Sequence, residues 1–131
     1  MFFSVRPDDP LPIYDQIVRQ VKFAIARKSL LAGERLPSVR ELAKDLQVNP
    51  NTVVRAFQLL QQESLIEPQR GVGFLVAAGA VRECQRQRRE LVRSRLEATL
   101  REAREAGLTD EELDKLFRQS LQAIPVAEVE S

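Results

Sequence analysis

The sequence contains no histidine and no tryptophan, and it has one cysteine among its 131 residues. Without histidine there is no His-dependent catalytic triad, and with a single cysteine there is no Cys/His zinc site and no internal disulfide. The sequence shows no glycine-rich phosphate loop and no cluster of carboxylates or lysines that would mark an active site. We therefore expect a protein that is not an enzyme and that holds neither a metal nor another cofactor.

Long hydrophobic runs are also lacking, and the start MFFSVRPDDP has no charged segment followed by an apolar core. We therefore expect no membrane span and no signal peptide, and a single cysteine fits the reducing cytoplasm. The formal net charge is only +1. This balance neither indicates nor excludes a nucleic-acid partner, so the local arrangement of residues must decide.

The stretch from residue 38 to residue 62 predicts two short helices joined by a tight turn. Ser38 with Glu41 three residues later is the pattern of a capping box, which satisfies free backbone N–H groups at a helix start. Asn49 followed by Pro50 is typical of the N-cap and the first position of a second helix. Both segments also carry apolar residues at helical spacing, so each helix has one face to bury.

The second of these helices has a polar face as well, with Thr52 beside it. Its members recur at positions i, i+4, i+7 and i+11 and are Asn51, Arg55, Gln58 and Gln62. Asn and Gln pair bidentately with adenine, Arg pairs with guanine, and a Thr methyl contacts the thymine methyl. We therefore predict a helix-turn-helix whose recognition helix begins at Asn49. An ordinary pair of amphipathic helices would show the same periodicity.

Residues 65–77 favour the helix-turn-helix, because they predict a β-hairpin directly after it. Two short apolar runs flank a turn-rich stretch at residues 68–73. Such a hairpin is a wing, with Arg70 at its tip to meet phosphate or the minor groove, and with Gly71 and Gly73 allowing close backbone approach. A hairpin with a purely structural role is the alternative.

Residues 11–28 predict a long amphipathic helix that covers this unit, with Pro12 in its first turn. Tyr14 lies either in the core, which we favour, or toward a partner. The preceding ten residues form either a frayed end or an extended arm whose apolar side chains pack on the body; these side chains are Phe2, Phe3 and Val5. Leu36 is a candidate for a short strand that pairs with the wing.

Residues 80–124 predict a long helix that stops at Gly107 and a shorter one that Thr109 and Glu112 open with a second capping box. Each helix carries an apolar stripe, and two helices alone cannot bury both. We therefore expect a homodimer formed through this region. Cys84 lies on the stripe, where we expect it to fill the interface rather than to sense redox state. We interpret the arginines at 86–95 as a solvated face, with an additional DNA contact as the alternative, and residues 125–131 as a loose tail.

The segments PIYDQI, AGERLPSVRELA, VNPNTVVRAFQLL and RGVGFLV resemble the GntR family of bacterial transcription regulators, and the short two-helix tail is similar to its YtrA-type subfamily. The resemblance implies a winged-helix domain, a homodimer and an operator with two-fold symmetry. By motif match, Arg40 and the start of the recognition helix would face DNA. The chain also departs from the family pattern at several positions. Gln47 stands where glycine is usual, which predicts a left-handed residue in the turn. The other departures are Val54 in place of a frequent arginine, Ser64 in place of a glycine, and Val72 in place of a wing lysine.

We predict a mainly α fold with a small β-wing: a winged helix-turn-helix domain at residues 11–79, followed by a dimerisation region at 80–124. The helix-turn-helix is expected at about 38–62 and the wing at about 65–77. The expected function is a sequence-specific DNA-binding transcription regulator, a repressor that acts as a homodimer on a two-fold symmetric operator, with an unknown small-molecule effector left open. The predicted DNA-binding residues are Arg40, Asn49, Asn51, Thr52, Arg55, Gln58, Arg70, Gly71 and Gly73. The alternative is a helical protein-interaction adaptor that keeps the winged-helix fold without binding DNA.

Overall fold

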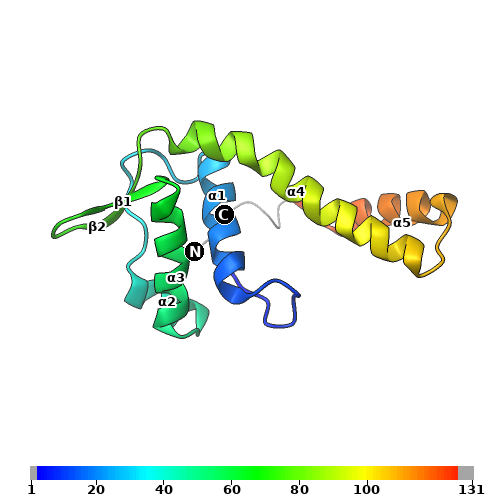
Figure 1. Ribbon diagram of the computed structural model, residues 1–131, viewed down its shortest axis with the longest axis horizontal. Helices are drawn as coiled ribbons and strands as arrows, with labels where there is room; N and C mark the ends of the chain where they lie inside the picture. The colour runs from blue at the N-terminus through cyan, green and yellow to red at the C-terminus, as the bar shows by residue number, and fades with distance from the viewer. Residues whose placement is uncertain (1–2, 127–131) are drawn as a thin grey trace. The chain divides into compact units, whose positions relative to one another are not determined.

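The computed structural model describes residues 3–126, which form five helices and one two-stranded antiparallel sheet (Figure 1). In chain order, the elements are α1 (Ile13–Ala26), α2 (Val39–Leu46), α3 (Pro50–Gln62), β1 (Ile66–Gln69), β2 (Gly73–Val76), α4 (Ala80–Glu105) and α5 (Asp110–Ala123). The predicted fold class, mainly α with a small β-wing, is confirmed. Contacts within the chain divide it into two units after Arg88.

The core of the first unit lies where α1 packs against α3. The fully buried side chains at this contact are Ile17, Val21 and Ile25 of α1 and Val53, Phe57 and Leu60 of α3. Helix α1 begins one residue later than its proline suggested, with Pro12 at the N-cap. Phe3 is buried and Val5 packs against the core, so the described part of the arm lies on the body. Phe2 falls outside the described residues.

Local chemistry fixes the turn between α2 and α3. The Glu41 N–H donates to Ser38 Oγ at 3.0 Å, and the Glu41 carboxylate accepts from the Ser38 N–H, so the predicted capping box opens α2. The helix ends at Gln47, whose φ of 56° and ψ of 48° are left-handed. The Val48 N–H then donates to the Ala43 carbonyl at 3.0 Å, the bond that closes a Schellman motif. Gln47 therefore holds the position predicted for it.

The same left-handed ending recurs at other helices. Ser64, after α3, has a φ of 61°, and the next N–H, that of Leu65, donates to the Leu60 carbonyl at 3.0 Å. Lys28, after α1, has a φ of 64°, which the sequence did not lead us to expect. After α4 the position is taken by Gly107, as predicted. Three of these four helices thus stop at a residue with a Cβ, which costs conformational energy.

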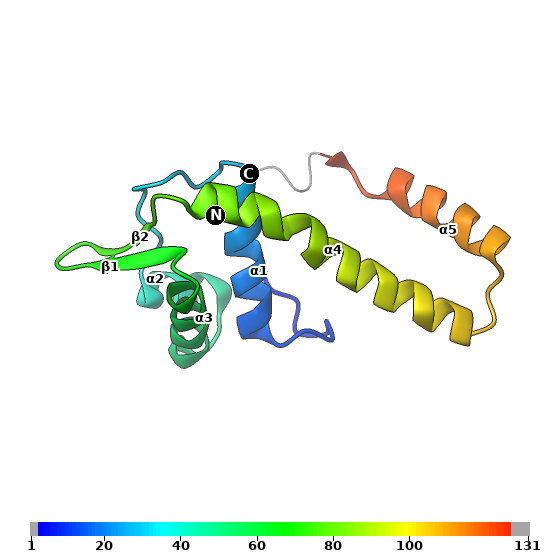
Figure 2. The same cartoon turned by 45° about the horizontal axis from the view of Figure 1, so that its top comes forward.

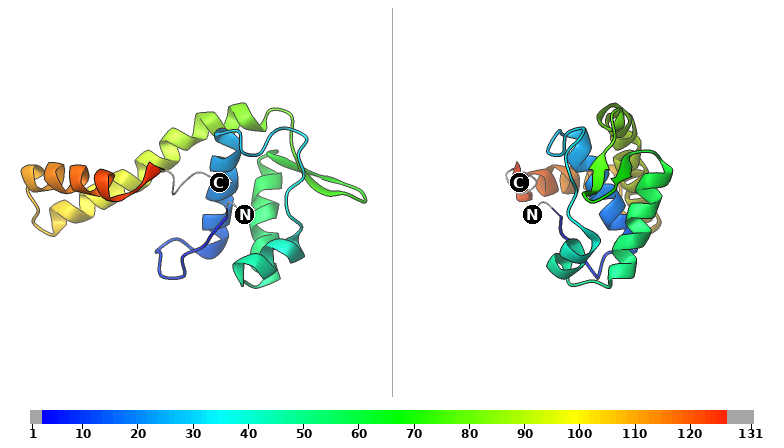
Figure 3. Two further views of the ribbon diagram at one scale, coloured as in Figure 1. Left: turned by 180° about the vertical axis from the view of Figure 1, so that it is seen from behind. Right: turned by 90° about the vertical axis from the view of Figure 1, so that its left-hand side faces the viewer.

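The predicted wing is present as the antiparallel pair β1 and β2 (Figure 3). Its turn is shorter than expected, because Pro68 and Gln69 pair with β2 and only residues 70–72 form the connection. The rings of Phe57 and Phe74 meet edge to face, with centroids 5.4 Å apart, and so anchor β2 to the recognition helix.

A third extended segment lies along β2, as considered for Leu36. The Leu36 N–H donates to the Phe74 carbonyl at 2.9 Å, and the Val76 N–H donates to the Glu34 carbonyl at 2.9 Å. An isolated bridge pairs Arg35 with Leu75. The edge of β2 is therefore covered, and the wing is tied to the chain that leads into α2.

The first turns of α4 belong to the core of the first unit. Ala80 and Cys84 are each 1% exposed within one chain. The expectation that Cys84 fills an interface between subunits is therefore wrong. Burial raises the pKa of its thiol to about 11, which keeps it neutral near pH 7 and poorly nucleophilic.

A buried lysine also joins α1 to this segment. Lys22 Nζ lies 2.8 Å from Glu63 Oε2 and donates to Gln87 Oε1 at 2.9 Å. Gln87 in turn donates to Glu63 Oε1 at 3.0 Å. The end of the recognition helix, the middle of α1 and the start of α4 thus share one polar cluster, whose three members satisfy one another.

The second unit consists of the rest of α4 and α5, and α5 runs back along the second half of α4 (Figure 2). The predicted capping box at Thr109 and Glu112 opens α5. Arg104 also pairs with Asp110 at 3.0 Å across the turn. Among residues 3–126, no helix is both long and apolar enough to cross a membrane. Of the tail predicted to be loose, residues 127–131 lie outside the described part.

Candidate nucleic-acid interface

The recognition helix α3 presents the polar face that its sequence predicted. Asn51, Arg55 and Gln58 are exposed, and Thr52 is half-buried beside them. The opposite face of the helix is the buried one that packs on α1. Within Pro50–Gln62 there is no carboxylate, so nothing on this helix would repel a phosphate backbone.

Asn49 has a structural task at the start of α3. Its Oδ1 accepts a hydrogen bond from the Asn51 N–H at 2.8 Å, the usual arrangement of an N-cap. The side-chain oxygen is therefore engaged within the protein, while the amide NH₂ of Asn49 is available to donate to a phosphate. Its cap also fixes the direction in which α3 begins.

Helix α2 adds cations next to the start of α3. Arg40 and Lys44 are exposed and four residues apart, so they lie on one face of α2. Both line an open groove of about 540 Å³ whose other walls are Val39, Ala43, Val48 and Pro50. Arg40 was predicted as a site residue. Lys44 was missed, although its spacing from Arg40 and its place before the turn would have indicated it.

The wing carries the predicted Arg70, Gly71 and Gly73, all exposed, and both glycines have positive φ, at 79° and 118°. Arg35 was missed, and it holds the wing turn in place. Its Nε donates to the Val72 carbonyl at 3.1 Å, and its Nη2 lies 2.9 Å from Glu41 Oε1. Only a contact between distant segments reveals this role.

Arg35 thereby joins the wing to the capping box of α2. The Ser38 hydroxyl and backbone, followed by Arg35, lower the pKa of Glu41 through their hydrogen bonds to its carboxylate. Glu41 therefore stays ionised near pH 7 and accepts from two elements at once. Arg35, in the segment before α2, thus links the start of α2 to the wing through the Glu41 carboxylate on one side and the Val72 backbone carbonyl on the other.

Arg55 does not project freely from α3. Its guanidinium carbon lies 3.8 Å above the centre of the Tyr14 ring. Tyr14 is half-buried and packs against the hydrophobic core, so the expected core position is only part of its role. The predicted guanine-reading arginine therefore has an aromatic support on α1.

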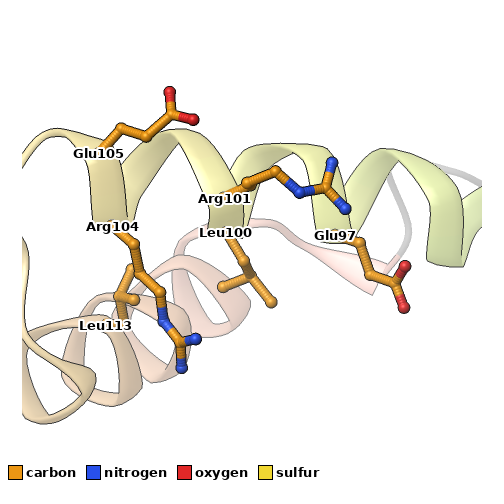
Figure 4. A pocket seen from close by; sticks show the side chains of 6 residues that line it. All are labelled: Glu97, Leu100, Arg101, Arg104, Glu105 and Leu113. Carbon is orange, nitrogen blue, oxygen red and sulfur yellow. The ribbon is translucent and has the colours of Figure 1, made fainter.

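A second surface, on the second unit, is apolar. Its large side chains are 39–61% exposed: Val92, Leu96, Leu100, Leu116, Phe117, Leu121 and Ile124. An open hollow of about 530 Å³ lies between α4 and α5. Figure 4 shows Leu100 and Arg104 extending from α4 toward α5, which contributes Leu113, whereas Glu105 points away. The two helices leave their apolar stripes unburied within one chain, as the sequence predicted.

Three features define a winged helix-turn-helix protein of the DNA-binding class: the exposed amide and arginine face of the recognition helix, the exposed Arg40 and Lys44 on one face of α2, and Arg70 at the wing tip. Comparison with known proteins agrees. Residues 13–76 match the family model described as bacterial regulatory proteins, gntR family. The chain is 40% identical over 104 residues to the uncharacterised HTH-type transcriptional regulator YhcF of Bacillus subtilis (strain 168), covering 78% of this chain and 84% of that one. It is 32% identical over 116 residues to the HTH-type transcriptional repressor YtrA of the same organism, covering 88% and 89%.

Solved structures give the same result. A GntR family transcriptional regulator from Listeria monocytogenes superposes with a TM-score of 0.64 at 32% identity, covering 86% of this chain and 97% of that one. The AraR DNA-binding domain in complex with operator ORE1 superposes with a TM-score of 0.50 at 25% identity, covering 56% and 89%. The chain belongs to the GntR family and is a transcription regulator of the YtrA type.

Proposed function

We propose that this regulator represses transcription in the cytoplasm, without catalytic activity, by binding as a homodimer to an operator with two-fold symmetry. The main observation that supports a DNA-binding surface is the exposed polar face of α3. Asn51, Arg55 and Gln58 line it, and no carboxylate lies among them. These side chains would read base edges in the major groove, with Thr52 against a thymine methyl.

The flanking contacts would set the register on the duplex without reading sequence. Arg40 and Lys44 would meet phosphates beside the start of α3, and Arg70 would do so from the wing. Gly71 and Gly73 let the wing backbone come close to the duplex. The Asn49 side chain mainly fixes the start of the recognition helix, and its amide N–H groups could donate to a phosphate. A repressor role is supported by the relative YtrA, which is named as one.

A homodimer is supported by the exposed apolar stripes on α4 and α5. Exposed leucine, phenylalanine and isoleucine side chains at helical spacing favour burial against a second copy of the same surface. Two linked recognition helices would then address half-sites about one helical turn, ~34 Å, apart. Any small-molecule effector would bind where the two copies meet, because the part of the second unit that the structure describes offers two helices with which to enclose one.

Selection from a random duplex library with the full chain tests this function. We expect enrichment of an inverted repeat, with an affinity that falls as salt rises because phosphate contacts release counterions. Asn51→Ala and Arg55→Ala should each weaken binding to the selected duplex by ~1–3 kcal/mol. Arg82→Ala, an exposed arginine of α4 outside the proposed interface, is the matched control. A protein-interaction adaptor would instead enrich no sequence and bind no duplex.

A further inference from the structure

We propose that Tyr14 is a positioning residue for sequence reading, because it holds the guanidinium of Arg55 in the orientation in which that side chain meets DNA. The proposal rests on the function proposed above and adds a residue of α1 to it. Its starting observation is the 3.8 Å between the Arg55 guanidinium carbon and the centre of the Tyr14 ring. The two residues come from different helices that pack together in the core.

The ring of Tyr14 is a fixed support. It lies in the first turn of α1 and packs against buried core residues. The chain before this turn is secured by the buried Gln16, whose Nε2 donates to the carbonyls of Arg6 and Leu11 at 2.9 Å each. The Arg6 N–H also donates to Gln16 Oε1 at 2.8 Å. The start of α1, and with it the ring, is therefore held by side-chain and backbone contacts alike.

Stacking on a ring leaves an arginine able to bind. A cation over an aromatic face uses the flat side of the guanidinium, whereas its N–H donors lie in the plane and point outward. The N–H groups of Arg55 thus stay available for the O6 and N7 atoms of a guanine or for a phosphate. The positive charge of Arg55 is also retained, whereas a carboxylate partner would neutralise it.

Other arginines of the chain show the contrast. Arg35, Arg86 and Arg93 lie within 3.0 Å of a glutamate oxygen, so their donors and charge are partly used within the protein. For Arg55, among the described residues, the recorded partner is an aromatic ring. An aromatic support orders a long side chain before binding, which reduces the entropy lost on binding. This arrangement suits a side chain that must reach one base edge in one orientation.

A double-mutant cycle tests the role. The first probe is the duplex selected with the full chain. Arg55→Ala identifies the G·C pair that Arg55 reads, because this variant no longer distinguishes that pair from A·T. The second probe is the same duplex with this G·C pair changed to A·T. Tyr14→Leu removes the ring and Tyr14→Phe keeps it, and each is made with Arg55 and with Arg55→Ala. We expect Tyr14→Leu to weaken binding to the selected duplex about two- to fivefold, the equivalent of an exposed cation–π contact. Its preference for the G·C pair should fall by the same factor.

Two further results are expected if Tyr14 acts through Arg55. Tyr14→Phe should bind within about twofold of the parent, because the ring face is retained. Tyr14→Leu should have no further effect in the Arg55→Ala background. Circular dichroism and thermal melting of each variant show that the fold is intact, and if Tyr14→Leu is unfolded, Tyr14→Met replaces it.

Opposite results overturn the proposal. An equal loss from Tyr14→Leu with and without Arg55 would mean that Tyr14 acts alone. A loss with Tyr14→Phe as large as with Tyr14→Leu would assign the effect to the hydroxyl group. Full affinity and full G·C preference in Tyr14→Leu, with a loss in Arg55→Ala, would show that Arg55 needs no support. Failure of the unmodified chain to enrich or bind any duplex would instead overturn the proposed function itself.

Discussion

Replacing Gln47 with glycine should make the protein more stable. Gln47 is exposed and sits in the left-handed region, at a φ of 56° and a ψ of 48°. An L-residue with a Cβ loses ~1–2 kcal/mol there, whereas glycine loses none. The backbone bond that closes the turn, from the Val48 N–H to the Ala43 carbonyl, does not involve the side chain and is kept.

Part of the gain is offset in the unfolded state, where glycine has more freedom and costs about 0.4–1 kcal/mol to order. The expected net gain is therefore about 0.5–1 kcal/mol. For a unit of this size, 1 kcal/mol corresponds to about 4–8 °C in melting temperature, so Gln47→Gly should melt roughly 2–8 °C higher.

Urea and thermal unfolding followed by circular dichroism measure the change. The urea midpoint should rise with the slope m unchanged, since the unfolded surface is the same. Gln58→Gly is the matched control, because it makes the same substitution at an exposed position inside α3. There glycine should cost about 1 kcal/mol. A Gln47→Gly variant that melts at or below the parent temperature would show that the left-handed turn stores no such strain.

Two other changes probe the contacts that the first turns of α4 make within the first unit. Glu63→Ala should lower the free energy of unfolding by about 1–3 kcal/mol, because the Lys22 ammonium stays buried with only Gln87 as an acceptor. Unfolding measurements on Glu63→Ala and on the double variant with Lys22→Met should show that the double variant recovers most of this stability. Cys84 has a folded pKa raised from 9.0 to about 11, so the unfolded chain loses its thiol proton first as the pH rises. Between about pH 9 and pH 11, the stability of the parent should fall relative to Cys84→Ala, with a slope that approaches ~1.4 kcal/mol per pH unit; equal slopes for the two proteins would contradict burial of the thiol.

Local signals in the sequence predicted the elements well. Capping residues such as Ser38 with Glu41 act over one helical turn, so the helix starts follow from the sequence. The wing between residues 65 and 77 likewise followed from two short apolar runs around a turn-rich stretch, whereas the left-handed Gln47 was predicted from the resemblance to the family, in which glycine is usual at that position. The proposed base-reading residues on α3 were placed by helical spacing, and the structure exposes Asn51, Arg55 and Gln58 on one face with Thr52 half-buried beside them.

Contacts between distant segments were not predictable in the same way. Periodicity places Tyr14 on a helix but does not show that an arginine 41 positions later lies over its ring. The link from Arg35 to the wing and the polar cluster around Lys22 are similar cases. Cys84 lies on an apolar stripe of α4 that continues into the second unit. Only the packing of the folded chain shows that the helical turn containing Cys84 belongs to the first unit.

The place of Cys84 also decides where the tail can be removed. A cut after Gly79 would take Ala80 and Cys84 out of the core of the first unit, since both are 1% exposed. A cut after Arg88 follows the division of contacts and keeps that core. Residues 1–88 should therefore fold as a winged helix without the apolar stripes of the second unit.

The affinity of residues 1–88 for the selected inverted repeat, measured against that of the full chain, tests a dimeric DNA-binding regulator most directly. Sedimentation of both proteins in the same buffer gives their masses. A full chain that sediments as a dimer should bind at least ~100-fold more tightly than a monomeric 1–88, because it joins two recognition helices. Equal affinity of the two proteins, or a full chain that sediments and binds as a monomer, would contradict it.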